Sequence, residues 1–296
     1  MDFVAINKPD PSKKTICIIA EGSYPYITGG VSAWIQDIIT GLTNYNFIIF
    51  AISAEEDEPK YLFPPNVIGL VNRLLTAPVE KTKKSIQSSF FSNIESFHND
   101  MMQKKDFSRF SEIFKLINKH RYDPSSLQRH ITSFNIVTQY NEIRNPLYPF
   151  SDYYWACRSS HEYMMKIMTW DLPPADLYHT ISTGYAGLCA ASAKIKYNKP
   201  VILTEHGLYN KEREIDIKRA TWVKGYQRDM WINIFNDLSA ITYEYSDCVI
   251  SLFEVNRNIQ IAQGAKREKT LVIPNGIEID LYLDLKTETR KEFSVG

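Results

Sequence analysis

Short apolar runs alternate with stretches of helical spacing through most of this chain, and this alternation constrains its fold more than any other feature. The runs at 14–22, 46–53 and 199–207 are dominated by Ile, Val, Leu and Phe. They lack the polar alternation of a strand with one wet face, so each is expected to be buried on both faces. Apolar residues recur at helical spacing after Gly30. Buried strands separated by helices predict a Rossmann-like, doubly wound parallel sheet of the α/β class.

The second half of the chain continues the same alternation. Further strands are expected at 176–181, 247–252 and 270–273, the last followed by a turn at 274–277. Further helices are expected at 151–170, 184–195 and 254–263, together with a long helical stretch at 211–245 that leaves room for one break.

Residues 76–148 interrupt this order. Lysines alternate there with Phe and Ile at helical spacing, and strand signals are few. We therefore expect a helical insertion that stays outside the sheet and either covers one flank of the domain or docks a partner. The lysines are expected to form a solvated helix face.

Charge and cysteine content exclude several classes of function. The chain has 34 Lys and Arg against 34 Asp and Glu, so net charge gives no reason to expect nucleic acid as a partner. Its four cysteines form no C-x-x-C pair, and neither a zinc site nor disulfides are expected. The first 14 residues lack the apolar core of a signal peptide, and no apolar run approaches a membrane span. These features are typical of a cytoplasmic protein.

The first candidate site lies in the loop after the first strand. In such sheets, ligands bind beyond the carboxyl ends of the strands. Gly29 and Gly30 lead into a helix there, where a ligand can approach the backbone and an anion can meet unpaired N–H groups. Tyr24 and Tyr26 of the same loop are candidates to flank a sugar ring, or they simply pack the loop down.

Two further strand ends carry polar residues. His179 ends one strand, and Ser182 and Thr183 begin the next helix. Glu205 and His206 end the following strand. A single histidine is often structural, but two at neighbouring strand ends favour a site. The chain has no H-E-x-x-H metal motif, and the absence of G-x-G-x-x-G argues against a nicotinamide-linked enzyme.

Four stretches carry a family resemblance: "EGSYPYITGGVSAWI", "YHTISTGYAGL", "TEHGLYNKERE" and "VIPNGI". They resemble the N-terminal half of the Pel exopolysaccharide glycosyltransferases and their relatives, which belong to the retaining GT-B enzymes often called family 4 glycosyltransferases. The resemblance covers nearly the whole chain, and 76–148 is its least specific part.

The resemblance implies a GT-B fold of two Rossmann-like domains, with the acceptor on the N-terminal domain and the nucleotide-sugar donor on the C-terminal one. By resemblance, Gly29 and Gly30 match the loop that approaches the donor diphosphate. His179 matches a position near the transferred sugar and is the candidate catalytic residue, although Ile181 replaces a second histidine that many relatives have. Glu205 and His206 match the loop on the acceptor side. From the residues themselves, Tyr24, Tyr26, Ser182 and Thr183 are further candidates to line the cleft.

The expected domain is residues 1–280, with 281–296 as the start of an interdomain segment. Only 19 residues follow Ile277, whereas a donor domain needs on the order of 150. We therefore expect the donor domain to be absent from this chain and the chain alone to be inactive.

The expected function is that of a retaining glycosyltransferase, which transfers a sugar from a nucleotide-sugar donor, favoured to be UDP-linked, to a growing exopolysaccharide. No metal or cofactor is expected, and a membrane-bound polysaccharide synthesis complex is a candidate partner. The alternative is a non-catalytic, stand-alone sugar-binding or assembly module of such a complex.

Overall fold

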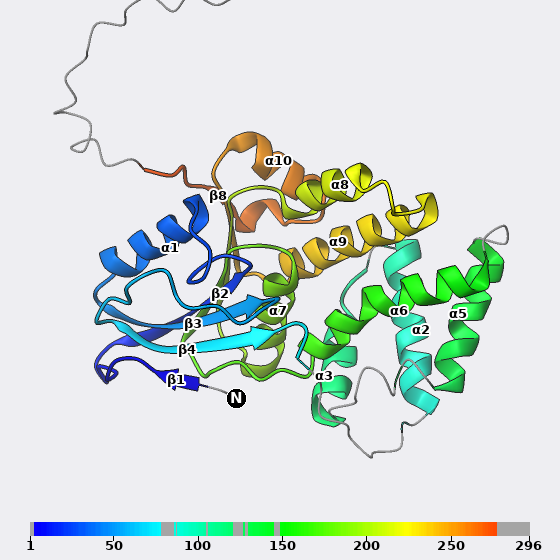
Figure 1. The fold of residues 1–296 in the computed structure, drawn as a ribbon, viewed down its shortest axis with the longest axis horizontal. Helices are drawn as coiled ribbons and strands as arrows, with labels where there is room; N and C mark the ends of the chain where they lie inside the picture. Colours follow the sequence, from blue (N-terminus) through cyan, green and yellow to red (C-terminus); the bar gives the residue numbers. More distant parts are fainter. Residues whose placement is uncertain are drawn as a thin grey trace, which may run out of the picture.

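One mixed sheet organises the protein. The computed structural model describes residues 3–77, 86, 88–104, 106–120, 127, 130–144 and 149–276. Within them, eight strands form a sheet in the order β1-β4-β3-β2-β5-β6-β7-β8 (Figure 1). The strands are β1 (Phe3–Ala5), β2 (Lys14–Glu21), β3 (Tyr45–Ser53), β4 (Val67–Leu74), β5 (Leu177–Thr180), β6 (Val201–Glu205), β7 (Cys248–Ser251) and β8 (Thr270–Val272). Only β1 runs antiparallel to its neighbour, β4.

The predicted α/β fold is confirmed, because the order from β4 to β7 is that of a nucleotide-binding Rossmann sheet. Helices of the sheet region are α1 (Gly30–Gly41), α7 (Tyr185–Tyr197), α8 (Tyr209–Arg219), α9 (Gly225–Tyr245) and α10 (Glu254–Ala262), followed by the short η1 (Arg267–Lys269). The long helical stretch predicted at 211–245 is broken once, between α8 and α9.

Apolar side chains project from both faces of the sheet, because successive residues of a strand point in opposite directions. Ile18 and Ala20 of β2 belong to the cluster that also holds Ile35 and Ile39 of α1. Cys17 and Ile19 of β2 belong to a second cluster, which includes α7 and the inserted helices. Each fully buried Ile of these clusters contributes about 2 kcal/mol through burial, so both faces stabilise the sheet.

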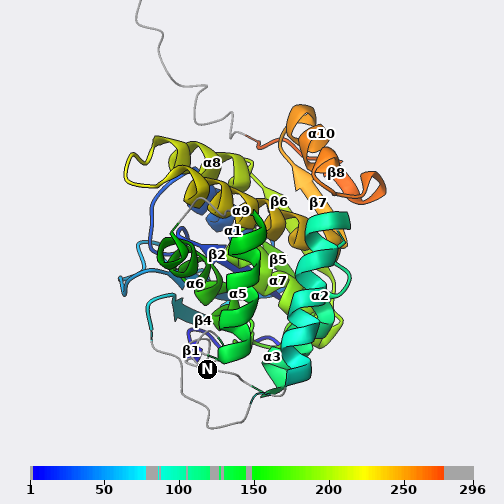
Figure 2. The same cartoon turned by 90° about the vertical axis from the view of Figure 1, so that its right-hand side faces the viewer.

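In the described residues between β4 and β5, the regular elements are all helices. They include α2 (Ser88–Lys104), α3 (Phe110–His120), α5 (Ile131–Arg144) and α6 (Phe150–Ile167). These helices form a group beside the sheet in Figure 1, and Figure 2 views that group from its outer side. The predicted helical insertion is therefore confirmed for the described residues. Residues 78–85, 121–126 and 145–148, and the predicted interdomain segment 281–296, lie outside them.

The sequence predictions missed β1 and β4. In β4, Asn72 and Arg73 interrupt the apolar run, and Gly69 further weakens the strand signal. Gly69 is needed because a Cβ there would lie 2.1 Å from the ring of Phe3, which packs across the strand. Strand β1 has three exposed residues and no sequence signal of its own.

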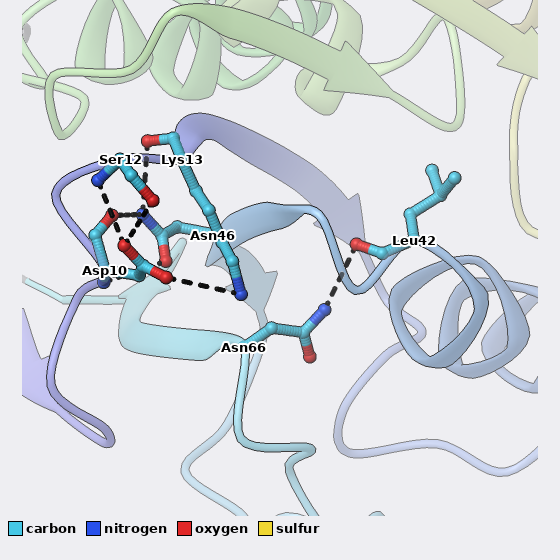
Figure 3. Close-up of polar contacts among 6 residues, drawn as sticks. All are labelled: Asp10, Ser12, Lys13, Leu42, Asn46 and Asn66. Carbon is cyan, nitrogen blue, oxygen red and sulfur yellow. Dashed lines mark hydrogen bonds and ion pairs between the residues drawn. The ribbon is translucent and has the colours of Figure 1, made fainter.

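Side-chain hydrogen bonds of two asparagines connect the loops at the amino end of the sheet (Figure 3). Asn46 of β3 exchanges two hydrogen bonds with the Asp10 backbone, its Nδ2 donating to the carbonyl at 2.8 Å and its Oδ1 accepting from the amide at 3.2 Å. Asn66 Nδ2 donates to the carbonyls of Ile39 at 2.8 Å and Leu42 at 3.3 Å at the end of α1. These buried amides are paired within the protein, so the carboxyl end is the better place to look for a ligand.

Candidate functional site

The candidate site lies where the strand order reverses, between β2 and β5. The chain leaves β2 toward α1 and leaves β5 toward α7, on opposite faces of the sheet. Connections that diverge in this way leave a crevice at the carboxyl ends of the two strands, and ligands of open α/β sheets bind there. The loops after β2, β5 and β6 border this position.

Glu21 holds these loops together. It ends β2, and its carboxylate accepts hydrogen bonds from Ala186 N in the first turn of α7 at 3.0 Å and from the Tyr209 hydroxyl of α8 at 3.0 Å. Burial raises the pKa of Glu21, although these hydrogen bonds act in the opposite direction. The turn follows at Gly22, whose φ of 57° favours glycine. Glu21 was not among the predicted site residues, although a lone acid between an apolar strand and a glycine is a signal in the sequence.

Gly29 and Gly30 lie at the exposed amino end of α1. Gly29 is the N-cap residue, no side chain caps the helix, and no acidic residue occupies its first turn. The first backbone N–H groups of α1 are therefore open to an anion. A Cβ built on either glycine would meet nothing within 4 Å, so close packing against the protein does not explain this pair.

Tyr24 and Tyr26 were expected either to flank a sugar ring or to pack the loop down, and their burial favours packing. Both are buried, with exposed fractions of 0% and 7%. The ring of Tyr24 lies 5.1 Å from that of Tyr61 and 6.3 Å from that of Phe63, and its hydroxyl donates to Gln36 Oε1 at 2.8 Å. The segment at 61–63 covers the loop, so the tyrosines pack it in place and are not available to a ligand.

Glu205 and Thr183 are also buried, which corrects their assignment as cleft-lining residues. Glu205 is 1% exposed and Thr183 0%. Glu205 Oε1 accepts from the Thr183 hydroxyl and the Tyr209 amide, both at 3.1 Å. Its Oε2 accepts from the Tyr243 hydroxyl at 2.9 Å and from Gln260 Nε2 at 2.8 Å. Glu205 is thus the centre of a paired network that joins β6 to α8, α9 and α10.

The two predicted histidines both contact Trp34, a residue of α1. The ring of Trp34 is 4.6 Å from His206 and 5.9 Å from His179, edge-on to both. His179 Nε2 lies 2.8 Å from Thr204 Oγ1. Burial, followed by the nearby His206, lowers the pKa of His179 to about 4, and burial also lowers that of His206. Both rings are therefore neutral at pH 7.

Three buried polar atoms at this edge have no hydrogen-bond partner among the described residues: Ser23 Oγ, Ser182 Oγ and His206 Nε2. Each lies within two residues of the end of a neighbouring strand, β2, β5 or β6. Buried polar atoms are nearly always paired, because an unpaired one costs about 1–3 kcal/mol. Three such atoms thus lie together at the ends of the adjacent strands β2, β5 and β6.

The described residues contain no group of three or more His, Cys, Asp and Glu side chains that could hold a metal ion. The four cysteines are free thiols. In the same part of the chain, no helix is long and apolar enough to cross a membrane.

A family model described as "Domain of unknown function (DUF3492)" matches residues 14–268. The chain belongs to this family. The match includes the three strand-end loops and the helical insertion of this DUF3492 protein. No curated protein matches the chain.

Among solved structures, the chain is similar to the crystal structure of Anabaena Alr3699/HepE in complex with UDP and glucose. The two are 14% identical, the match covers 91% of this chain and 46% of that one, and the TM-score is 0.39. The chain thus spans slightly less than half the length of that protein.

Proposed function

We propose that this chain is the acceptor-side, Rossmann-like part of a retaining, nucleotide-sugar-dependent glycosyltransferase that extends an exopolysaccharide, with a UDP-linked sugar as donor. The observation that carries the proposal is the set of three unpaired polar atoms at the carboxyl edge, Ser23 Oγ, Ser182 Oγ and His206 Nε2, beside the open amino end of α1. A sugar offers several hydroxyl groups, each able to donate and accept, which suits hydroxyl and imidazole partners. The motif resemblance to GT-B enzymes points the same way.

In this proposal the two parts of the edge have different tasks. The N–H groups of α1 after Gly29 meet the diphosphate, where they stabilise the negative charge of the leaving group. His206 binds a sugar hydroxyl, and Trp34, which packs against the imidazole of His206, holds that imidazole in place. His179 remains neutral, so it serves as a hydrogen-bonding group near the transferred sugar and not as a cation. Rate enhancement then comes from holding the acceptor hydroxyl against the anomeric carbon.

The test is a titration with UDP, several UDP-sugars and free monosaccharides, followed by saturation-transfer NMR. We expect His206→Ala and Ser182→Ala each to weaken sugar binding about tenfold, since each removes one ligand hydrogen bond. Ser159→Ala is the matched control, because Ser159 lies on α6 and its hydroxyl bonds Ala156 O. Equal binding by all three variants contradicts the proposal.

Transfer is then assayed on the full-length protein by release of the nucleoside diphosphate. Release that depends on a saccharide acceptor supports the glycosyltransferase. Sugar binding with no transfer under any donor supports the alternative of a non-catalytic sugar-binding module.

A further inference from the structure

Exposed aromatic side chains gather on α5 and at the start of α6. Trp155 is 59% exposed, and Phe134 is exposed as well. The ring of Phe134 lies 5.2 Å from that of Phe150 and 5.7 Å from that of Tyr154, and the rings of Tyr154 and Trp155 lie 5.6 Å apart. A ring packed in a core is removed from water, whereas this cluster keeps part of its apolar area in contact with it. Exposed apolar patches mark contacts with proteins or membranes.

A second exposed tryptophan lies close to this cluster. Trp222, in the turn between α8 and α9, is 84% exposed. Lys224, two residues later, pairs with Asp152 in the first turn of α6. Asp152 and Trp155 are three residues apart on that helix and therefore lie on the same side of it. In Figures 1 and 2 the turn between α8 and α9 lies above α6. We call the combined surface the aromatic surface, made by Phe134, Phe150, Tyr154, Trp155 and Trp222.

The turn between α8 and α9 is basic. Residues 217–228 contain no acid and four cations, which are Lys218, Arg219, Lys224 and Arg228. Arg219 and Arg228 have no acidic partner among the described residues, whereas the two lysines form ion pairs with acids. Exposed acids lie near these segments at Glu162, Asp216 and Asp229, so the positive excess is modest. The aromatic surface thus combines apolar rings with a small positive charge.

The form and chemistry of this surface favour a lipid bilayer over a protein as its partner. Trp222 protrudes from a turn, so a folded protein would need a pocket of matching shape, whereas a fluid bilayer accepts single protruding rings. Tryptophan and tyrosine prefer the level of the lipid headgroups, where the ring is in apolar surroundings and its N–H or O–H stays hydrated. Lysine and arginine beside them attract anionic headgroups. Both properties meet where the guanidinium carbon of Arg158 lies 5.1 Å from the ring centroid of Trp155.

We propose that the aromatic surface binds to the face of a lipid bilayer that contains anionic lipids. Trp155 and Trp222 insert at the level of the headgroups, and the cations of 217–228 lie against the headgroup phosphates. The surface includes no residue of the loops after β2, β5 and β6. The proposal therefore does not depend on the function proposed above.

The experiment is flotation of the chain with two kinds of vesicle, phosphatidylcholine alone and equal parts of phosphatidylcholine and phosphatidylglycerol. We expect saturable binding to the mixed vesicles. Binding to phosphatidylcholine alone is expected to be about fivefold weaker or less than that, because each cation near an anionic surface strengthens binding by about that factor. Added salt is expected to remove this difference, since it screens exposed charges. Quenching of tryptophan fluorescence by brominated phosphatidylcholine in the mixed vesicles reports ring insertion.

Variants assign the binding to this surface. Trp155→Ala and Trp222→Ala are each expected to weaken binding to the mixed vesicles about tenfold, because each removes one inserted ring. Both side chains are exposed, so both variants are expected to fold, which circular dichroism checks. Arg219→Gln is expected to weaken binding to the mixed vesicles about fivefold and to leave binding to phosphatidylcholine unchanged. Phe253→Ala is the matched control, since Phe253 is as exposed as Trp155 but precedes α10, away from the turn between α8 and α9 in both views.

Four results overturn the proposal. The first is no binding to either kind of vesicle, and the second is equal binding by Trp222→Ala and Phe253→Ala. The third is binding without quenching by the brominated lipid, since the rings then lie outside the bilayer. The fourth is self-association that Trp222→Ala abolishes, without vesicle binding, which identifies the surface as a protein contact. Unchanged UDP-sugar affinity in Trp222→Ala supports a surface separate from the strand-end site.

Discussion

Replacement of Glu205 tests whether this carboxylate is structural, as its burial indicates, or lines the site, as its sequence position suggested. Glu205→Ala removes an acceptor from four donors: Thr183, Tyr209, Tyr243 and Gln260. Thr183 retains a second partner, Ser239, at 2.8 Å. Three donors therefore lose a buried partner, each at about 1–3 kcal/mol. Relaxation recovers part of this sum, and we expect a loss of about 4 kcal/mol in the free energy of unfolding.

The assay is urea unfolding followed by circular dichroism, with the melting temperature as a second measure. A loss of 4 kcal/mol corresponds to a melting temperature lower by about 8–16 °C for a domain of this size. Glu205→Gln keeps the shape and one acceptor, so its expected loss is about 2 kcal/mol. Wild-type stability in Glu205→Ala, combined with lost sugar binding, would refute the structural role.

Comparison of wild type with Glu205→Gln also tests how stability depends on pH. Burial raises the pKa of Glu205, so the folded chain binds a proton at this residue more tightly than the unfolded chain does. The free energy of unfolding therefore falls as pH rises from the unfolded value near 4.3 through the raised folded one. Glu205→Gln lacks this titration. The stability difference between wild type and Glu205→Gln should thus narrow over that window; a difference that widens contradicts the account.

Three further predictions follow from single sites. Gly30→Val should change the free energy of unfolding by less than about 1 kcal/mol, since a Cβ there meets open space, yet weaken nucleotide-sugar binding at least tenfold in calorimetry. Lys166→Met should cost about 2 kcal/mol in urea unfolding, because the buried ammonium bonds the carbonyl of Leu74 at the end of β4 and those of Leu75 and Ala77 just after it. Ellman's reagent at pH 8 should label Cys17 and Cys189 only after unfolding, because both are buried and burial raises both thiol pKa values.

Much of the fold could be predicted because parallel strands buried on both faces leave an apolar run in the sequence, as β2 and β3 do. Strand β4 does not, since Asn72 and Arg73 lie at its polar end and Ser53 of β3 bonds the Asn72 side chain. When the polar residues at the end of a strand form their hydrogen bonds with a neighbouring strand, the local sequence gives no signal that the segment is a strand.

The sequence predicted where the candidate site lies, but not which side chains contact one another there. Strand-end order placed His179 and His206 at one edge, because carboxyl ends of parallel strands meet there. The burial of Tyr24 depends on Tyr61, and that of Glu205 on Gln260, and neither partner is adjacent in sequence.

The measurement that tests the central claim most directly is NMR of the histidine side-chain nitrogens during titration with a UDP-sugar. The chain has six histidines, so selective ¹⁵N labelling gives a small set of assignable signals. If the strand-end edge is the nucleotide-sugar site, the signals of His206 and His179 shift with saturation, while those of His98 on α2 and His161 on α6 do not. Saturable shifts confined to His98 and His161, or no shift of His206 at saturating ligand, would contradict the claim.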